Sequence, residues 1–156
     1  MSSLNKIASD IVRKLKEKQK TFSTAESCTG GLIASSITEI PGASKVFLGG
    51  VVVYATEMKK RILKIPDEVF HYGVISEEMA EAMARAIKSI TVSDYSISTT
   101  GNLGPDTMEE KPKGLIYIAV STPEKLCIKE LNLTGDRLSN KIKATEEALK
   151  LLEEML

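Results

Sequence analysis

Tryptophan is absent from this sequence, and only 4% of its residues are aromatic. Aromatic platforms on which nucleic-acid bases stack are therefore not expected. An excess of positive charge is also missing, because 21 lysines and arginines balance 21 aspartates and glutamates. Surfaces that bind nucleic acids normally carry such an excess. These two absences argue against a nucleic-acid partner.

Cysteine and histidine are scarce as well. The two cysteines, Cys28 and Cys127, are too few for a disulfide framework, and no Cys/His cluster predicts a metal site. The single histidine, His71, stands in a predicted loop, where a structural role is more common than a catalytic one. We expect no metal and no cofactor.

Long hydrophobic runs are the third absence. No window holds the roughly 18 apolar residues that a membrane span needs. Residues 1–6 show no hydrophobic region of a signal peptide. We therefore expect a cytoplasmic protein without a membrane partner. Its 156 residues correspond to one domain, 1–156, with a core of ordinary size.

The hydrophobic pattern that is present predicts alternating strands and helices. Helical spacing of apolar residues and turn signals bound each element. Ser76 and Asp136 are typical helix caps, and Thr56 is a possible third. The early alternation predicts an α/β sheet covered on both faces, and the late strands predict an antiparallel hairpin that makes the sheet mixed. The predicted helices cover 2–18, 30–39, 56–63, 76–90 and 138–155, and the predicted strands 20–25, 46–54, 95–99, 115–120 and 126–133.

The segment Ala25–Gly31, Ala-Glu-Ser-Cys-Thr-Gly-Gly, joins a predicted strand to a predicted helix. Ser27 is a plausible nucleophile that needs a base, and Cys28 is its rival, because a helix start favours a thiolate. The helix start, with Thr29, Gly30 and Gly31, would offer backbone N–H groups to an anion. These residues alone leave Ser27, Cys28 and an ordinary turn of small residues as open alternatives.

A second segment follows the next strand. Tyr54 ends that strand, and Lys59 lies about one helical turn beyond it. If the two strands are neighbours, their carboxyl ends meet at the edge where open α/β sheets bind ligands. A desolvated Lys59 would then serve as the base for Ser27. A solvated helix face of lysines and arginine is the alternative interpretation.

Two further pieces point to anion binding. Thr100 and Gly101 end a strand, and their backbone N–H groups would cradle an oxyanion or phosphate, unless they form only a turn. The long polar loop at 102–113 would cover a site there. Arg137 stands in the first turn of a helix, where a cation opposes the helix dipole. Binding a phosphate or carboxylate explains that placement, and a surface ion pair is the alternative.

Taken together and in order, these pieces resemble the C-terminal domain of the CinA (competence/damage-inducible) family, whose members include nicotinamide-mononucleotide deamidases. Larger members of the family carry an additional N-terminal domain, so the sequence resembles the stand-alone form. The matching strings are 24–31, 41–44, 49–54, 57–59, 73–78, 100–101, 104–105, 110–112, Gly114 and 135–137.

The resemblance implies a three-layer α/β/α sandwich with a mixed, mostly parallel sheet. It also implies hydrolysis of the carboxamide of nicotinamide mononucleotide to nicotinate mononucleotide and ammonia, without a metal. By the same resemblance Ser27 is the nucleophile, Lys59 its base and Tyr54 a partner at the reacting centre. Positions that correspond to the family's substrate site are Gly42, Thr100 and Arg137.

One stretch departs from the family pattern. After Gly101 the family has small residues and later glycines, whereas this chain has a slightly shorter loop without those glycines. Asn102, Leu103 and Met108 would reshape the pocket. Two alternatives therefore stand beside the expected reaction: an amidohydrolase with another amide substrate, and a non-catalytic nucleotide-binding module. We also expect a homo-oligomer, from an apolar surface on the early helix and strands.

Overall fold

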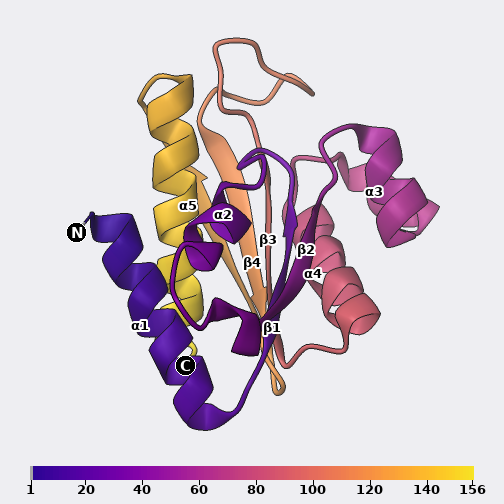
Figure 1. The fold of residues 1–156 in the computed structure, drawn as a ribbon. Coiled ribbons are helices and arrows are strands. Elements are labelled where there is room, and N and C mark those ends of the chain that lie inside the picture. Colours follow the sequence, from indigo (N-terminus) through magenta and orange to yellow (C-terminus); the bar gives the residue numbers. More distant parts are fainter. Residues whose placement is uncertain (1) are drawn as a thin grey trace.

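A computed structural model describes residues 2–156 (Figure 1). Helices and strands alternate through the first two thirds of the chain, and a hairpin and a long helix complete it. The elements are α1 (Ser3–Lys18), β1 (Phe22–Glu26), α2 (Leu32–Thr38), the 3-10 helix η1 (Ala43–Lys45), β2 (Phe47–Val52), α3 (Thr56–Leu63), the 3-10 helix η2 (Asp67–Tyr72), α4 (Glu77–Thr91), β3 (Tyr95–Gly101), β4 (Leu115–Ser121), β5 (Leu126–Asn132) and α5 (Arg137–Glu154).

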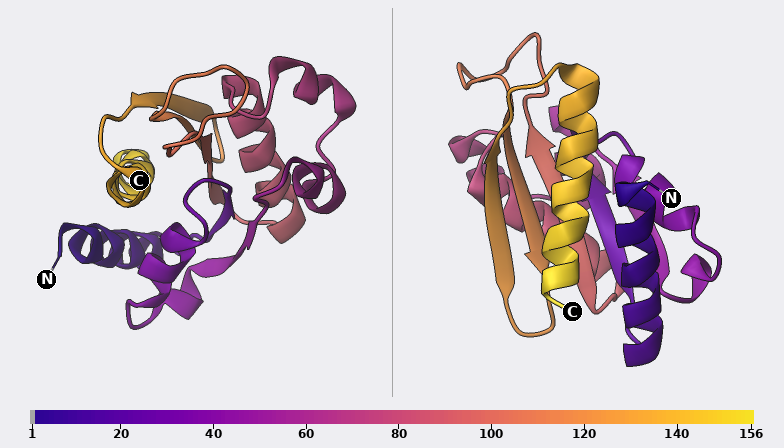
Figure 2. Two further views of the ribbon diagram at one scale, coloured as in Figure 1. Left: turned by 90° about the horizontal axis from the view of Figure 1, so that it is seen from above. Right: turned by 90° about the vertical axis from the view of Figure 1, so that its left-hand side faces the viewer.

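The five strands form one mixed sheet in the order β2-β1-β3-β4-β5. β1 pairs in parallel with β2 and with β3, whereas β4 is antiparallel to both of its neighbours. All strands except β4 therefore run in one direction. Figures 1 and 2 show α1, α2 and α5 on one face of the sheet and α4, with α3 beside it, on the other. The predicted α/β/α architecture with a mixed, mostly parallel sheet is confirmed.

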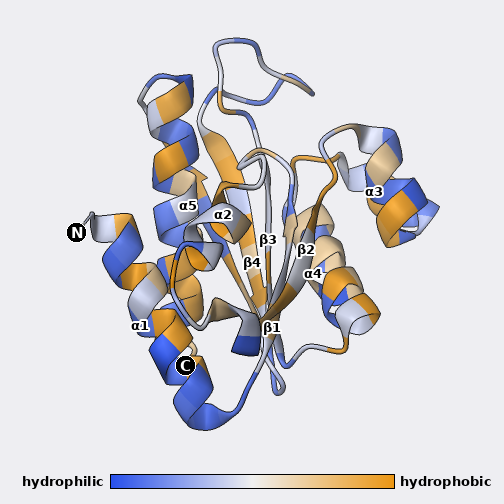
Figure 3. Ribbon diagram, in the orientation of Figure 1, coloured by the Kyte–Doolittle hydropathy of each residue, from blue (hydrophilic) through white to orange (hydrophobic). Residues whose placement is uncertain are grey.

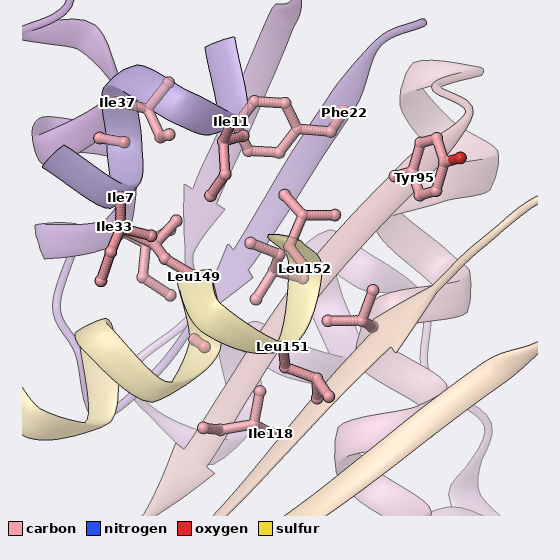
Figure 4. Packing of buried hydrophobic residues seen from close by; sticks show 14 of the residues in the cluster. Ile7, Ile11, Phe22, Ile33, Ile37, Tyr95, Ile118, Leu149, Leu151 and Leu152 are labelled. Carbon is pink, nitrogen blue, oxygen red and sulfur yellow. The ribbon is translucent and has the colours of Figure 1, made fainter. Parts of the chain in front are cut away.

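Each face of the sheet has its own apolar core. The larger core joins α1, α2 and α5 to the sheet, and Figure 4 shows Phe22 beside Ile11 at one end of this cluster. The smaller core lies under α4 and is built around Met79, Met83 and Ile87. Hydropathy follows this arrangement, since α1 and α4 each turn an apolar stripe inward and a polar one outward (Figure 3).

Two of the three predicted helix caps are confirmed. Ser76 and Asp136 are confirmed, because their side chains accept hydrogen bonds from the backbone N–H groups of Met79 and Ser139. Thr56 as a cap is wrong. The cap position belongs to Ala55, which has extended backbone, and Thr56 is already the first helical residue.

The glycine pair of β2, Gly49 and Gly50, lies beside an irregularity in the pairing of β1 with β2. The pairing of β1 with β2 shifts register between Phe22 and Ser23, so that Phe22 faces Phe47 and Ser23 faces Gly49. A Cβ atom at Gly50 would lie 2.1 Å from Thr24 Oγ1. Only glycine permits this close approach of the two strands.

The apolar face of α1 does not support the oligomer argument. Its residues Ile7, Ile11 and Leu15 are buried in the chain's own larger core. The homo-oligomer therefore stays a prediction without that support. Among residues 2–156 no helix combines the length and the apolar character that crossing a membrane requires.

Candidate active site

The carboxyl ends of β1 and β2 bring the first two candidate segments together. Glu26 pairs with Val52 at the end of the parallel ladder, and Val53 N donates to Glu26 O at 2.8 Å. Ser27 follows β1 and Tyr54 follows β2, so both lie at the same edge of the sheet. This is the edge at which open α/β sheets bind ligands.

Ser27 and Lys59 are in hydrogen-bonding contact. Lys59 Nζ lies 3.0 Å from Ser27 Oγ, 2.9 Å from Val53 O and 3.2 Å from Tyr54 O. The helix α3 carries Lys59 back over the end of β2. Its amine therefore reaches the carbonyls of Val53 and Tyr54, the two residues that follow β2. The solvated interpretation of Lys59 is wrong, because this side chain is only 1% exposed.

Burial also sets the acidity of the amine. Loss of hydration disfavours the charged form and lowers the pKa of Lys59 from 10.5 to about 8. A pKa of about 8 leaves about a tenth of the amine neutral at pH 7. An amine with this pKa can accept a proton near neutral pH.

The environment of Cys28 disfavours the thiolate, which is the nucleophilic form of cysteine. The side chain is buried, and burial raises the pKa of its thiol to about 12, although a hydrogen bond with Thr99 favours the thiolate. A thiol with this pKa stays protonated at neutral pH and attacks poorly. Of the two nucleophiles that the sequence left open, the geometry favours Ser27.

Glu26 has a structural role that the sequence analysis did not predict. Its buried carboxylate accepts hydrogen bonds from Gly31 N (3.1 Å), Ile33 N (3.0 Å), Ala34 N (3.0 Å) and Thr29 Oγ1 (2.7 Å). Gly31 occupies the cap position of α2 and has no side chain to satisfy these groups, so Glu26 caps the helix from outside. A glutamate that precedes a helix without a capping side chain was the available signal.

The start of α2 therefore does not attract an anion as the sequence predicted. Gly31 N–H is bonded to Glu26, and Gly30 N donates to Ser27 O at 3.1 Å. The donor role expected of Gly30 and Gly31 is wrong for this reason. The N–H groups of Cys28 and Thr29 differ, since they donate no hydrogen bond within residues 2–156. They stand directly after Ser27, where an oxyanion formed at the serine would lie.

A cavity of about 450 Å³ opens beside this loop. Its volume lies in the range of small-molecule sites, about 300–1,000 Å³. The loop after β3 supplies most of its wall, as the sequence predicts. The lining residues are Cys28, Tyr54, Asn102, Leu103, Pro105, Asp106, Thr107, Met108 and Arg137. A larger hollow of about 510 Å³ between α3 and α4 is mostly apolar, and no serine or cysteine among residues 2–156 lines it.

Arg137 and Tyr54 meet across this cavity. Arg137 Nη2 donates to Tyr54 Oη at 2.9 Å, and Nη1 donates to Gly104 O at 2.7 Å. In the described part of the chain no carboxylate lies within ion-pair distance of Arg137, so the surface ion pair is wrong. A guanidinium held by neutral acceptors keeps its charge available to an anion.

Lys141, one turn after Arg137 on α5, was also missed. A Cβ atom added to Gly30 would lie 3.1 Å from Lys141 Nζ, so the ammonium group lies over the loop between Ser27 and α2. It forms no hydrogen bond or ion pair with residues 2–156. Arg137 thus lines the cavity and Lys141 lies beside Gly30, while Asp106 is the acidic residue in the cavity lining. Helical spacing of four residues was the available signal.

The remaining predicted positions lie less directly at the site. Thr100 Oγ1 donates to Val74 O at 2.5 Å, and Gly101 packs against Leu115 O, where a Cβ would be 2.6 Å away. Both support the strand end that carries the loop. Gly42 precedes the start of β2 and lies beside Lys16, so within this chain the structure does not bring it to Ser27. His71 is exposed in η2.

Known proteins are similar to this chain in sequence. The model of the CinA C-terminal domain matches residues 4–156. A putative competence-damage inducible protein of Caldanaerobacter subterraneus is 44% identical over 129 residues, which cover 81% of this chain and 31% of that protein. Its counterpart in Thermoanaerobacter pseudethanolicus is 42% identical over 150 residues, or 94% of this chain and 36% of that protein. The chain therefore spans about a third of the length of these relatives.

Solved structures show the same fold. The competence/damage inducible protein CihA of Agrobacterium tumefaciens superposes with a TM-score of 0.94 at 29% identity, covering 99% of this chain and 96% of that one. The CinA superfamily protein of Escherichia coli gives a TM-score of 0.95 at 28% identity, over 98% and 90% of the two chains. A match along nearly all of the sequence, with the same sheet and helices, shows that this chain belongs to the CinA C-terminal domain family.

Proposed function

We propose that this protein hydrolyses the carboxamide of nicotinamide mononucleotide to nicotinate mononucleotide and ammonia, with Ser27 as nucleophile and Lys59 as base. The observation that carries the proposal is the 3.0 Å contact between Lys59 Nζ and Ser27 Oγ, made by a buried lysine. A serine hydroxyl is inert without a base, and this contact supplies one.

The partners of Lys59 suit a neutral amine. A neutral amine has two N–H groups and one lone pair, and the carbonyls of Val53 and Tyr54 accept the two N–H groups. The lone pair then faces the hydroxyl of Ser27. In this protonation state Ser27 donates its hydrogen bond to Lys59, which is the geometry that general-base catalysis needs.

The reaction follows from this arrangement. Lys59 takes the proton of Ser27 as Oγ attacks the carboxamide carbon, and the carbonyl oxygen becomes an oxyanion. The unpartnered N–H groups of Cys28 and Thr29 would stabilise that charge. The Lys59 ammonium returns the proton to the leaving nitrogen, so that ammonia departs and an ester remains on Ser27. Water, activated by Lys59, then hydrolyses the ester to the carboxylate and restores Ser27.

The charge around the cavity supports an anionic substrate. Arg137 lines the cavity, and Lys141 lies one turn further along α5 without an acidic partner among residues 2–156. Arginine and lysine are the usual contacts of phosphate groups. A mononucleotide would place its phosphate near these two cations and its carboxamide near Ser27.

Ammonia release from nicotinamide mononucleotide tests the proposal, with nicotinamide and glutamine as control substrates. We expect turnover of the mononucleotide alone, and a loss of at least about 10³-fold in Ser27→Ala and in Lys59→Met. Ser35→Ala, on the exposed side of α2, and Lys60→Met, next to Lys59 but exposed, are the matched controls and should keep full activity. Near-normal turnover in Ser27→Ala would show that the mechanism is wrong.

The wall of the cavity favours one alternative. Asn102, Leu103 and Met108, which depart from the family pattern, all line the cavity, so a different amide is the second candidate substrate. In that case an electrophilic serine probe would label Ser27 while nicotinamide mononucleotide is not turned over. Binding of the mononucleotide with neither labelling nor ammonia would instead indicate a non-catalytic nucleotide-binding module.

A further inference from the structure

The loop between β3 and β4 has an internal brace. Asn102 Nδ2 donates to Met108 O and to Lys111 O, both at 3.2 Å, and its Oδ1 accepts from Met108 N at 3.0 Å. These bonds close residues 102–111 on themselves. The braced loop is also the main wall of the cavity, so whatever holds this loop in place also shapes the site.

Glu109 and Lys111 clamp the loop to the segment that leads into α4. The Glu109 carboxylate accepts from Val74 N at 2.8 Å and from Ile75 N at 3.0 Å. Lys111 Nζ donates to Ile75 O and, at 3.3 Å, to Glu109 Oε1. Backbone donors and acceptors of one short segment are thus bound by two side chains of the loop. The clamp therefore joins the loop to residues 74–75 through both backbone N–H and backbone C=O groups.

Two features show that the chain accommodates the clamp. Glu109 has a φ of +60°, a left-handed conformation that residues other than glycine rarely adopt. A Cβ atom at Gly73 would lie 2.6 Å from Glu109 Oε1, so that any side chain there would displace the carboxylate. Unfavourable backbone is retained where surrounding contacts over-determine it, as the bonds to Val74 and Ile75 do here.

The Glu109 carboxylate is charged at neutral pH. Burial alone would raise its pKa, but the hydrogen bonds from Val74, Ile75 and Lys111 outweigh burial, and the pKa falls below its ordinary value. Two groups act electrostatically on Lys59, the thiol of Cys28 and the carboxylate of Glu109, and both raise the pKa of the amine against the larger effect of burial. Since Cys28 is a neutral thiol at neutral pH, Glu109 is the permanent charge of the pair.

We propose that Glu109 is a positioning residue, which fixes the wall of the cavity and supplies a constant negative charge to the site. It touches neither Ser27 nor Lys59, so it acts through the loop and through its field. The kinetic part of this inference rests on the proposed amide hydrolysis. The clamp and the field can be measured without any turnover.

The test compares Glu109→Gln with Glu110→Gln in the whole chain. Glu110 is the adjacent residue, is exposed, has a similar φ of +57° and forms no hydrogen bond or ion pair within residues 2–156, so it is a matched control. In Glu109→Gln we expect KM to rise about tenfold and the acid limb of the pH profile of kcat/KM to move to lower pH. Glu110→Gln should match the unmodified protein in both.

Lys111→Met separates the two roles of the clamp. This substitution removes the hydrogen bond from Lys111 to Ile75 O but leaves the carboxylate of Glu109. KM should therefore rise, while the acid limb of the pH profile of kcat/KM does not move to lower pH. A shift to lower pH in Lys111→Met as large as in Glu109→Gln would contradict the field that we assign to Glu109.

An NMR titration of the Lys59 side chain, followed at its ε-carbon, decides the inference independently of turnover. We expect a lower pKa of Lys59 in Glu109→Gln than in Glu110→Gln, and faster amide hydrogen exchange at Val74 and Ile75. Equal values in the two variants would overturn the inference, even in a fully active enzyme. A lower pKa in Glu109→Gln alone would support it, even if nicotinamide mononucleotide is not the substrate.

Discussion

The face of the sheet that α1, α2 and α5 cover is joined to its helices mainly by apolar side chains, whereas the face under α4 adds a row of hydrogen bonds. On the first face Ile97 packs with Leu149 in the larger core. On the second face Ser96 Oγ donates to Ala84 O at 2.6 Å, and Ser98 Oγ donates to Ala80 O at 2.5 Å. Thr100 continues this row to Val74 O.

The difference separates stability from position. Apolar contacts are non-directional and stabilise in proportion to the area removed from water. Hydrogen bonds contribute less free energy but set distance and direction. The hydroxyl row fixes where α4 and the Val74–Ser76 segment lie against β3, and that segment is where the loop of the cavity is clamped. The larger core buries more apolar side chains than the smaller one, so we expect it to contribute more to stability.

The largest effect on stability should come from the larger core. Leu149→Ala removes a fully buried side chain between α5 and the sheet, and we expect a loss of about 3 kcal/mol in the free energy of unfolding. Denaturant unfolding measures this change. The activity per folded molecule should stay unchanged, because Leu149 lies about three turns along α5 from Arg137. A selective loss of activity without loss of stability would break the comparison.

The buried amine of Lys59 should instead lower the free energy of unfolding, by an amount that depends on pH. The folded-state pKa of Lys59, about 8, lies below its unfolded value of 10.5, so between these values the unfolded state binds more protons and stability rises with pH. Relative to Lys59→Met, the protein should gain on the order of 2 kcal/mol between pH 7 and pH 10. Unfolding curves of both proteins at several pH values measure it. Parallel pH dependences would show that Lys59 keeps an ordinary pKa.

A smaller effect is expected from the hydroxyl row. Ser98→Ala removes one hydrogen bond to Ala80 O, which stays bonded within α4, and the loss should be about 1 kcal/mol. If position is what this row supplies, KM or kcat should also change. Thr38→Ala, which removes an exposed hydroxyl bonded to Ser35 O within α2, is the control and should change neither. An unchanged activity in Ser98→Ala would remove the positional role.

The smallest effect is a gain. Val92 ends α4 with a φ of +56° and is 84% exposed, a conformation that is unfavourable for a β-branched residue. Val92→Gly should raise the free energy of unfolding by about 1 kcal/mol, with activity unchanged, because the residue lies at the far end of α4 from Val74. Val92→Ala keeps the Cβ atom and should gain less. An equal gain in the two variants would point to the exposed apolar surface instead.

Much of the fold could be predicted because its signals are local. Helical spacing located α1 and α4, and Ser76 and Asp136 marked the starts of α4 and α5 through contacts within one turn. The prediction of Thr56 as a cap was wrong by one residue. Ala55, the residue before it, has the extended backbone of the cap position. The alternation of elements and the resemblance predicted a mixed, mostly parallel sheet, but the order β2-β1-β3-β4-β5 came only from the structure.

The site could be predicted only in part. Ser27, Lys59, Tyr54 and Arg137 were named from their places after strands and in a helix turn, and the structure brings all four to one edge of the sheet. The role of Glu26 was missed because it depends on Gly31 having no side chain to cap α2. Gly42 was expected at the site from the resemblance alone, and the chain places it before the opposite end of β2.

The residue types at the strand ends and the apolar faces of the helices can be read from the chain, because both depend on near neighbours in sequence. Three properties of the site needed the packed chain: Lys59 is buried, Cys28 stays a thiol and Glu109 reaches Val74. Those properties arise from desolvation and from contacts between segments far apart in sequence, and these exist only once the chain has packed.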